Sequence, residues 1–292
     1  MRNIDRIRNI FLILTAVITA GLPFAGDLSG IVQEPHMTPE QFLEGRPYSE
    51  IGNMIIIEPS SSFWVFGLAA VLLVVAILFI VKSDGENSRF LWGLGMVFWA
   101  VSAASAGLSY QSFGYELKAR GHEFVLYTSW PEIIYMMLAF YSIALLLAAT
   151  GYFALETRRG VIKNSLFSCI YSFVYAVIMA AGVLTENTFL MSYNAFLLFS
   201  GVNFVLMFIY SVRHYRRYRD NLNKRMIIIW LSIAVVNGLY FVYLLSGLGN
   251  ILWSKGVWFT ANDVLHVLLI IWIIQGAVML YRTMRDGRMR GI

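Results

Sequence analysis

Residues 257–281 read VWFTANDVLHVLLIIWIIQGAVMLY, and this last long apolar run indicates the fold class. A helix needs about 20 residues to cross the hydrocarbon core of a bilayer, so the run is long enough to span it. Near its start it carries Asn262, Asp263 and His266, whose spacing places all three side chains on one helical face. Because polar groups at that depth are costly without partners, we expect this face to point into the protein or into a water-filled cavity.

The composition of the whole chain predicts a polytopic membrane protein. The 292 residues are 59% hydrophobic and 13% charged, with a mean hydropathy of +0.67, whereas soluble domains are about 25% charged. The net charge of +5 does not indicate nucleic-acid binding, because no reading motif accompanies the basic run 213–219, which is typical of a loop beside anionic headgroups. The one cysteine, Cys169, excludes an intrachain disulfide and a cysteine-based metal site.

The apolar runs predict an all-α bundle of eight transmembrane helices in a single membrane domain, residues 1–292. A basic N-terminus precedes the apolar segment 10–24, and together they predict a short first helix. A polar outer loop, 25–62, follows, in which residues 51–57 are expected to form a short strand or a surface-lying segment. The seven-helix core, 63–281, then has runs of about 20 residues at 63–81, 90–110, 131–155, 164–184, 189–211, 226–248 and 257–281.

Charge predicts the orientation of these spans. With the N-terminus inside, acidic side chains gather on the outer side, and all Lys and Arg lie on the inner side except Arg46, Lys118, Arg120 and Lys255. Positively charged loops remain in the cytoplasm, so we expect both termini there and loops 25–62 and 111–130 outside. The membrane is expected to be the plasma membrane of a bacterium or an archaeon.

The final helix then runs from outside to inside, which places Asp263 and His266 in the outer half of the bilayer. This pair is the candidate catalytic or metal-binding site, as a base with its orienting carboxylate or as two metal ligands. Two structural alternatives remain open. Thr260 or Asn262 could be the N-cap of the helix, which would leave Asp263 as a first-turn acid that complements the helix dipole. His266 could simply make an interhelical hydrogen bond.

A second polar cluster joins the third and fourth spans on the same outer side. It begins with Ser109-Tyr110-Gln111-Ser112-Phe113-Gly114-Tyr115-Glu116 and ends with Thr128-Ser129-Trp130-Pro131-Glu132. Ser129 and Glu132 have the spacing of a capping box, and Pro131 suits a first helical turn, so capping is the alternative role for Glu132. The candidate ligand-binding residues of the two clusters are Asn262, Ser109, Tyr110, Gln111, Glu116, Trp130 and Glu132.

Residue counts limit the cofactors. His266 is the one histidine within a predicted span, which excludes a bis-histidine haem, and no lysine lies within a span to form a retinal Schiff base. We therefore expect no cofactor, with zinc as the alternative. His266 and Asp263 could bind zinc together with His36 or His122, which lie on the same side.

Seven spans that begin outside, a serine-containing, aromatic-rich segment early in the core, and Asn-Asp-x-x-His opening the last helix resemble the ceramidase and progestin-receptor-type membrane hydrolase superfamily. The resemblance implies a zinc-dependent hydrolase. In that family the final helix offers two histidines four residues apart; here Asn262 occupies the first position and His266 the second, with Asp263 adjacent. Where the family has a further histidine in an early span, this chain has Tyr110 or no counterpart.

The residues support three hypotheses about function. The first is a membrane protein that binds a lipid, a small amphiphile or a partner membrane subunit at a polar site in the outer half of the bilayer. The second is a membrane-embedded, metal-dependent lipid hydrolase that acts through His266 and Asp263. The third is a proton-coupled transporter that uses the same pair, although the sequence lacks the repeat-related broken helices of many transporters. The expected partners are membrane lipids and other membrane subunits, and no nucleic acid.

Overall fold

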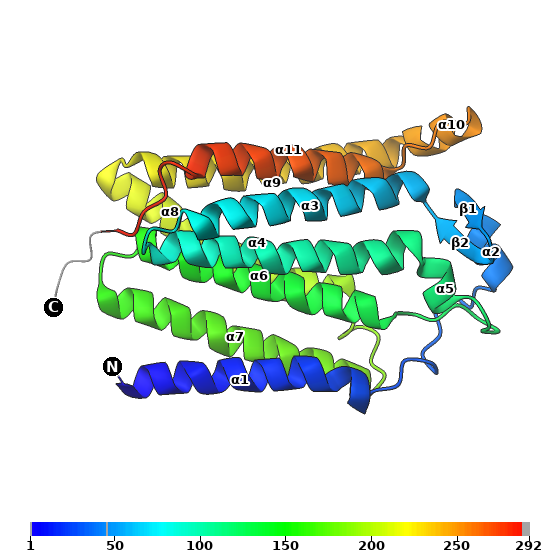
Figure 1. The fold of residues 1–292 in the computed structure, drawn as a ribbon, viewed down its shortest axis with the longest axis horizontal. Helices are drawn as coiled ribbons and strands as arrows, with labels where there is room; N and C mark the ends of the chain where they lie inside the picture. Colours follow the sequence, from blue (N-terminus) through cyan, green and yellow to red (C-terminus); the bar gives the residue numbers. More distant parts are fainter. Residues whose placement is uncertain (1, 45, 288–292) are drawn as a thin grey trace.

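The computed structural model describes residues 2–44 and 46–287 as a bundle of long helices (Figure 1). Within these residues, eight helices are long and apolar enough to cross a membrane, which confirms the predicted fold class. They are α1 (Arg2–Ala25), α3 (Pro59–Val81), α4 (Asn87–Ala106) with its π-helical continuation η1 (Gly107–Ser112), α6 (Trp130–Ala154), α7 (Arg158–Leu184), α8 (Tyr193–Tyr218), α9 (Asn221–Ser246) and α11 (Ala261–Leu280).

Helix α6 is central and α1 is peripheral. α6 packs against α4, α7 and α8, whereas α1 packs mainly against α7 at the edge of the bundle (Figure 1). In the most apolar stretch of each helix, 78% of the residues are buried in α6 but only 11% in α1. On the other side of the bundle, α11 packs against α3 and α9. Exposed apolar side chains such as Val17, Val242 and Val278 cover the outward faces, as expected for helices that contact lipid.

One end of the bundle carries most of the short elements, and we call it the hairpin end (Figure 1). Residues 51–57, which were expected to form a strand or a surface-lying segment, belong to an antiparallel pair of strands, β1 (Tyr48–Ile51) and β2 (Met54–Ile57). Glu116 holds this hairpin, because its Oε1 accepts a hydrogen bond from the Ile55 backbone N–H over 2.7 Å. The other short helices here are α2 (Pro39–Glu44), α5 (Gly114–Lys118) and α10 (Leu248–Ser254).

The opposite end, which we call the basic end, holds the start of α1 and the connections α3–α4, α6–α7 and α8–α9 (Figure 1). The basic run expected as an inner loop is mostly helical, since α8 continues to Tyr218 and α9 begins at Asn221. Arg219 makes the turn between them in the left-handed region at φ 53°. Asp220 then caps α9, because its Oδ1 accepts from the Asn223 backbone N–H over 2.8 Å.

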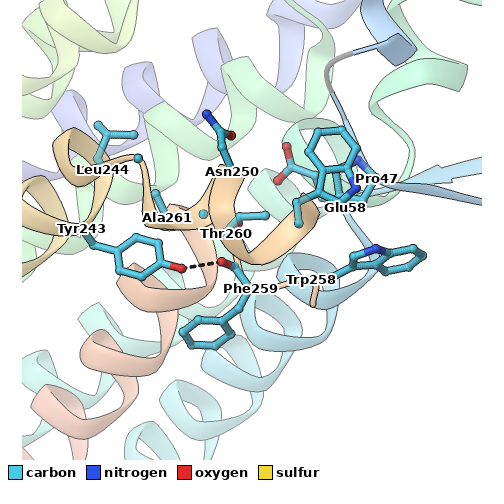
Figure 2. Close-up of a pocket in the computed structure, with 12 residues that line it drawn as sticks. Pro47, Glu58, Tyr243, Leu244, Asn250, Trp258, Phe259, Thr260 and Ala261 are labelled. Atoms are coloured by element: carbon cyan, nitrogen blue, oxygen red, sulfur yellow. Dashed lines mark hydrogen bonds between the residues drawn. The ribbon is translucent and has the colours of Figure 1, made fainter. Parts of the chain in front are cut away.

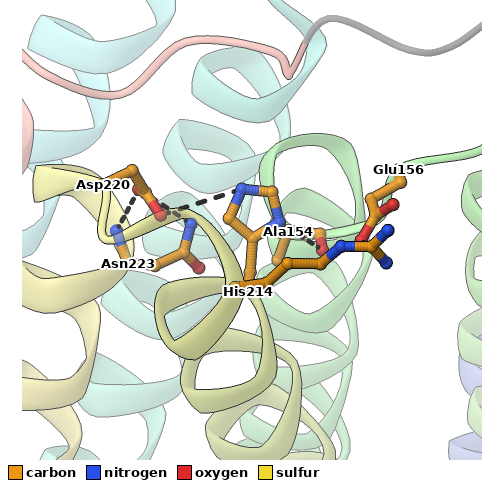
Figure 3. A network of polar contacts seen from close by, with 6 residues as sticks. Ala154, Glu156, His214, Asp220 and Asn223 are labelled. Atoms are coloured by element: carbon orange, nitrogen blue, oxygen red, sulfur yellow. Dashed lines mark hydrogen bonds and ion pairs between the residues drawn. The ribbon is translucent and has the colours of Figure 1, made fainter.

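Tertiary contacts explain why α8 continues beyond its apolar run into the basic residues (Figure 3). His214 Nδ1 lies 3.0 Å from the Ala154 carbonyl oxygen, and its Nε2 lies 3.7 Å from Asp220 Oδ2. Arg217 donates to Glu156 over 3.0 Å. These contacts join the end of α8 to the α6–α7 connection, and arginines in a last helical turn also complement the helix dipole.

The segment after α11 is fixed on the α3–α4 connection. The two carboxylate oxygens of Asp286 accept from the backbone N–H groups of Asn87 (3.0 Å) and Ser88 (2.8 Å). Arg89 Nε donates to the Met284 carbonyl over 2.6 Å. These bonds supply acceptors for N–H groups at the start of α4 that have no partner within the helix.

Candidate functional site

Asp263 belongs to the capping box that begins α11. Its backbone N–H donates to Thr260 Oγ1 over 3.4 Å, and its Oδ2 accepts from the Thr260 backbone N–H over 2.5 Å and from Ser60 Oγ over 3.0 Å. The side chain is fully buried. The structural alternative for Asp263 is therefore confirmed, with Thr260 as the N-cap.

Asn262 and His266 also lie against the protein. Asn262 Nδ2 donates to Glu58 Oε2 over 3.1 Å, and His266 is 9% exposed. In the described part of the chain, His266 Nδ1 and Asp263 Oδ1 have no hydrogen-bond partner. The polar face of the last span therefore points inward, as its sequence predicts, and two of its polar atoms stay unpaired.

Replacing Asp263 with alanine is expected to lower the free energy of unfolding by about 1 kcal/mol, the usual effect of losing a helix cap. The Thr260 N–H and Ser60 Oγ would both lose their acceptor. Thermal unfolding of the purified protein in detergent measures the effect. Asn262→Ala removes a single bond to Glu58 and is the matched control, expected to shift Tm less. Equal Tm values for the parent and Asp263→Ala would contradict the capping role.

Glu132, in the first turn of α6, is the centre of a buried polar network. Its Oε1 accepts from Lys118 Nζ over 2.6 Å and from Ser109 Oγ over 2.9 Å, and its Oε2 accepts from Thr128 Oγ1 over 3.1 Å. Glu132 is 3% exposed and Lys118 is 9% exposed. We call this set, together with Ser129, the Glu132 cluster.

The capping box expected for Ser129 and Glu132 is wrong. Ser129 is the N-cap residue of α6, but its hydroxyl shares a hydrogen bond with Ser109 Oγ and makes none to the helix backbone. The Glu132 carboxylate is likewise occupied by side chains, above all by the ammonium group of Lys118. A buried ammonium group needs a charged acceptor, and that need outweighs the weaker local cap.

The π-helical turn η1 places Ser109 beside this cluster. A Cβ on Gly107, the first residue of this turn, would lie 2.6 Å from Val65 Cγ1, so glycine allows the turn to approach α3 closely. Tyr110 follows, with its ring centroid 5.4 Å from Lys118 Nζ. Gln111 is 5% exposed, and its Oε1 has no partner among the described residues. π turns of this kind are frequent at functional sites.

Two of the predicted ligand-binding residues lie elsewhere. Trp130 packs beside Gly26, just after the end of α1. Glu116 accepts from Ile55 and pairs with Arg120 Nε at 3.0 Å. Both contacts fix the hairpin end of the bundle, and neither places the side chain among the contacts of Glu132.

Arg46 connects the two polar clusters electrostatically. Burial lowers the pKa of its guanidinium, and the carboxylates of Glu58 and Glu132 oppose that shift. The guanidinium also lies 4.1 Å from the ring centroid of Phe42. The sequence-predicted residues thus gather at the hairpin end, but as two separate networks whose hydrogen bonds are made mostly within each network.

A metal centre is not assembled at this end. Within residues 2–44 and 46–287, no group of three His, Cys, Asp or Glu side chains is placed to hold a metal ion. His36 instead stacks on Phe124, with ring centroids 4.6 Å apart. The zinc implied by the family resemblance therefore has no ligand set in the described part of the chain.

A cavity of about 220 Å³ lies beside the start of α11 (Figure 2). Its lining includes Glu58, Asn250, Trp258 and Thr260, and it is closed on one side by Tyr243, whose hydroxyl donates to the Phe259 carbonyl over 2.6 Å. The Glu58 carboxylate at its wall already accepts from Asn262.

A larger cavity, which we call the groove, lies between α1, α4, α6 and α7 in the half of the bundle nearest the basic end. It is half-open, with a volume of about 640 Å³, and ligand sites usually measure about 300–1,000 Å³. Leu12, Phe98 and Leu145 are among its apolar walls. Because α1 packs mainly against α7, its face toward α4 and α6 is left to line this space.

Sequence reasoning missed the groove, although it has a sequence signal. Small residues recur at helical spacing on three of its helices, at Ala16 and Ala20 of α1, Ala144 and Ala148 of α6, and Ser165, Ser168 and Ser172 of α7. Small side chains usually permit close helix packing in membranes. Here α1 packs against α7 and hardly against α6, so the small side chains leave an open space between α1 and α6.

Comparison with known proteins does not assign a function to these sites. No known protein family, no curated protein and no solved structure matches the chain.

Proposed function

We propose that this multi-pass membrane protein binds a lipid or lipid-like amphiphile in the groove. The observation that carries the proposal is a cavity of about 640 Å³, with mainly apolar walls, that lies between membrane-spanning helices. A space of this kind inside a bilayer is filled by hydrocarbon, because water has too few polar partners there.

The groove differs from the site expected at the start of α11. There the candidate polar groups are largely engaged by one another, through the capping box and the Glu132 cluster. A metal-dependent hydrolase would also need a ligand set, and the described residues gather none. Binding, not hydrolysis, is therefore the function that the geometry favours.

Selectivity in the groove must come from packing and polar contacts. Transfer of a chain from bulk lipid to an apolar groove gains little hydrophobic free energy, since lipid tails are as apolar as leucine. A molecule that stays bound must fit the walls better than the surrounding membrane lipids do, or carry a headgroup that the protein recognises.

Lipid that accompanies the protein through purification tests the proposal. We expect the detergent-purified chain to retain lipid in a fixed molar ratio, which solvent extraction and mass spectrometry would count. A chain that loses all lipid on mild detergent washing, while it remains folded, would refute the proposal.

We also propose that the basic end faces the cytoplasm, because Lys and Arg gather there. In a Cys169→Ser background, Glu50→Cys on the hairpin should react with a membrane-impermeant maleimide in intact cells. Asp84→Cys at the basic end should react only after the cells are lysed. Both positions are exposed, so the reverse pattern would overturn the orientation.

A further inference from the structure

The hydroxyl groups deep in the groove are already satisfied within the protein. Thr15 and Thr19 donate to backbone carbonyls one turn earlier on α1, and Ser168 and Ser172 do the same on α7. Thr19 also shares a hydrogen bond of 2.8 Å with the Tyr141 hydroxyl. These groups therefore offer few unused donors, and this part of the groove suits an acyl chain.

The end of the groove nearest the basic end has a different chemistry. Arg8, Asn9, Tyr152 and Ser165 line it, and together they bring a guanidinium, an amide and two hydroxyl groups to one place. Ser165 Oγ is buried and, within the residues the structure describes, has no hydrogen-bond partner. Ser165 lines the groove, so a polar ligand group there would be close to a hydroxyl that lacks a partner.

In the sequence, basic residues outnumber acidic ones at the starts of α1 and α7: Arg2, Arg6, Arg8, Arg158, Arg159 and Lys163 against Asp5 and Glu156. α1 and α7 begin at the same end of the bundle, and the two helices pack against each other (Figure 1). Arg158, Arg159 and Lys163 are exposed in the first two turns of α7. The nearby acid Glu156 is paired with Arg217 of α8 at 3.0 Å. The surroundings therefore favour an anionic group over a cationic or neutral one.

We propose that the groove selects an anionic phospholipid, with one acyl chain in the apolar part and the phosphate at the Arg8 end. This inference rests on the proposed function and deepens it. Arg8 is suited to the phosphate because a guanidinium has five N–H donors, so it can donate to phosphate oxygens as well as keep a contact within the protein. Ser165 and Asn9 line the same end of the groove and supply a hydroxyl and an amide for the remaining oxygens or for the glycerol ester.

Competition between two lipids tests the headgroup preference. Protein stripped of its bound lipid by prolonged exchange into a harsher detergent would receive equal amounts of phosphatidylglycerol and phosphatidylcholine with identical chains, and native mass spectrometry would count each bound species. We expect phosphatidylglycerol to be preferred by about fivefold, the factor expected for one basic side chain beside an anionic lipid. Arg8→Gln should abolish the preference while total binding persists.

Arg6→Gln is the matched control, because Arg6 is an exposed α1 residue that does not line the groove, and it should keep the preference. Ser165→Ala is a second variant that leaves the charge unchanged and should weaken retention of both phospholipids. Equal binding of the two lipids by the parent would overturn the headgroup inference and leave the proposed function standing. Failure of the folded parent to bind either lipid would overturn both.

Discussion

Replacing Ala16 with tryptophan is expected to reduce the lipid retained by the purified protein by roughly tenfold or more. Ala16 lies on the exposed face of α1 that lines the groove, so an indole placed there would occupy the space of the ligand. Forcing a ligand into an already filled site costs about 1–3 kcal/mol, which corresponds to about that loss of affinity. Extraction and mass spectrometry of copurified lipid measure the change.

Val17→Trp is the matched control for this variant. Val17 is the next residue of the same helix, is 61% exposed and does not line the groove. Neither substitution touches the core, so both variants should unfold within about 0.5 kcal/mol of the parent. If Ala16→Trp and Val17→Trp retained equal amounts of lipid, the bound lipid would not lie in the groove.

The second large effect is expected at Glu132. Replacing Glu132 with alanine leaves the Lys118 ammonium buried without its partner, and breaking a buried pair in this way costs about 3–5 kcal/mol. Ser109 and Thr128 would also lose their acceptor. In thermal unfolding, a loss of this size corresponds to a fall in Tm of about 10 °C.

Two further variants distinguish the loss of this ion pair from non-specific destabilisation. The double variant Lys118→Met with Glu132→Gln removes both charges and should recover most of the lost stability. Glu156→Ala breaks the more exposed pair with Arg217 and should cost at most about 1 kcal/mol. A Glu132→Ala variant that unfolds at the parental Tm would mean that the Glu132 cluster is not structural.

The number and order of the membrane spans could be predicted from the sequence, because each depends on one contiguous apolar run. The residues at which the helices begin and end were less predictable. α8 extends into the basic run because His214 and Arg217 find partners on the α6–α7 connection, which hydropathy alone cannot indicate. The inward orientation of Asp263 and His266 was predictable from helical spacing, and so was the Thr260 cap as an alternative.

The remaining site geometry depends on contacts between distant segments. The pairing of Lys118 with Glu132 requires the π-helical turn and the loop after it to return to the start of α6. The groove requires α1 to pack against α7 and leave α6 partly uncovered, which is a property of three helices together. Periodicity within one helix cannot specify either arrangement.

The most direct test of the account is an experimental density map of the protein reconstituted in phospholipid nanodiscs. We predict eight spanning helices and one ordered, elongated density in the groove, beside Ala16 and Leu145, that ends in a headgroup near Arg8. A map in which α1 closes onto α4 and α6, so that no lipid lies between them, would contradict it.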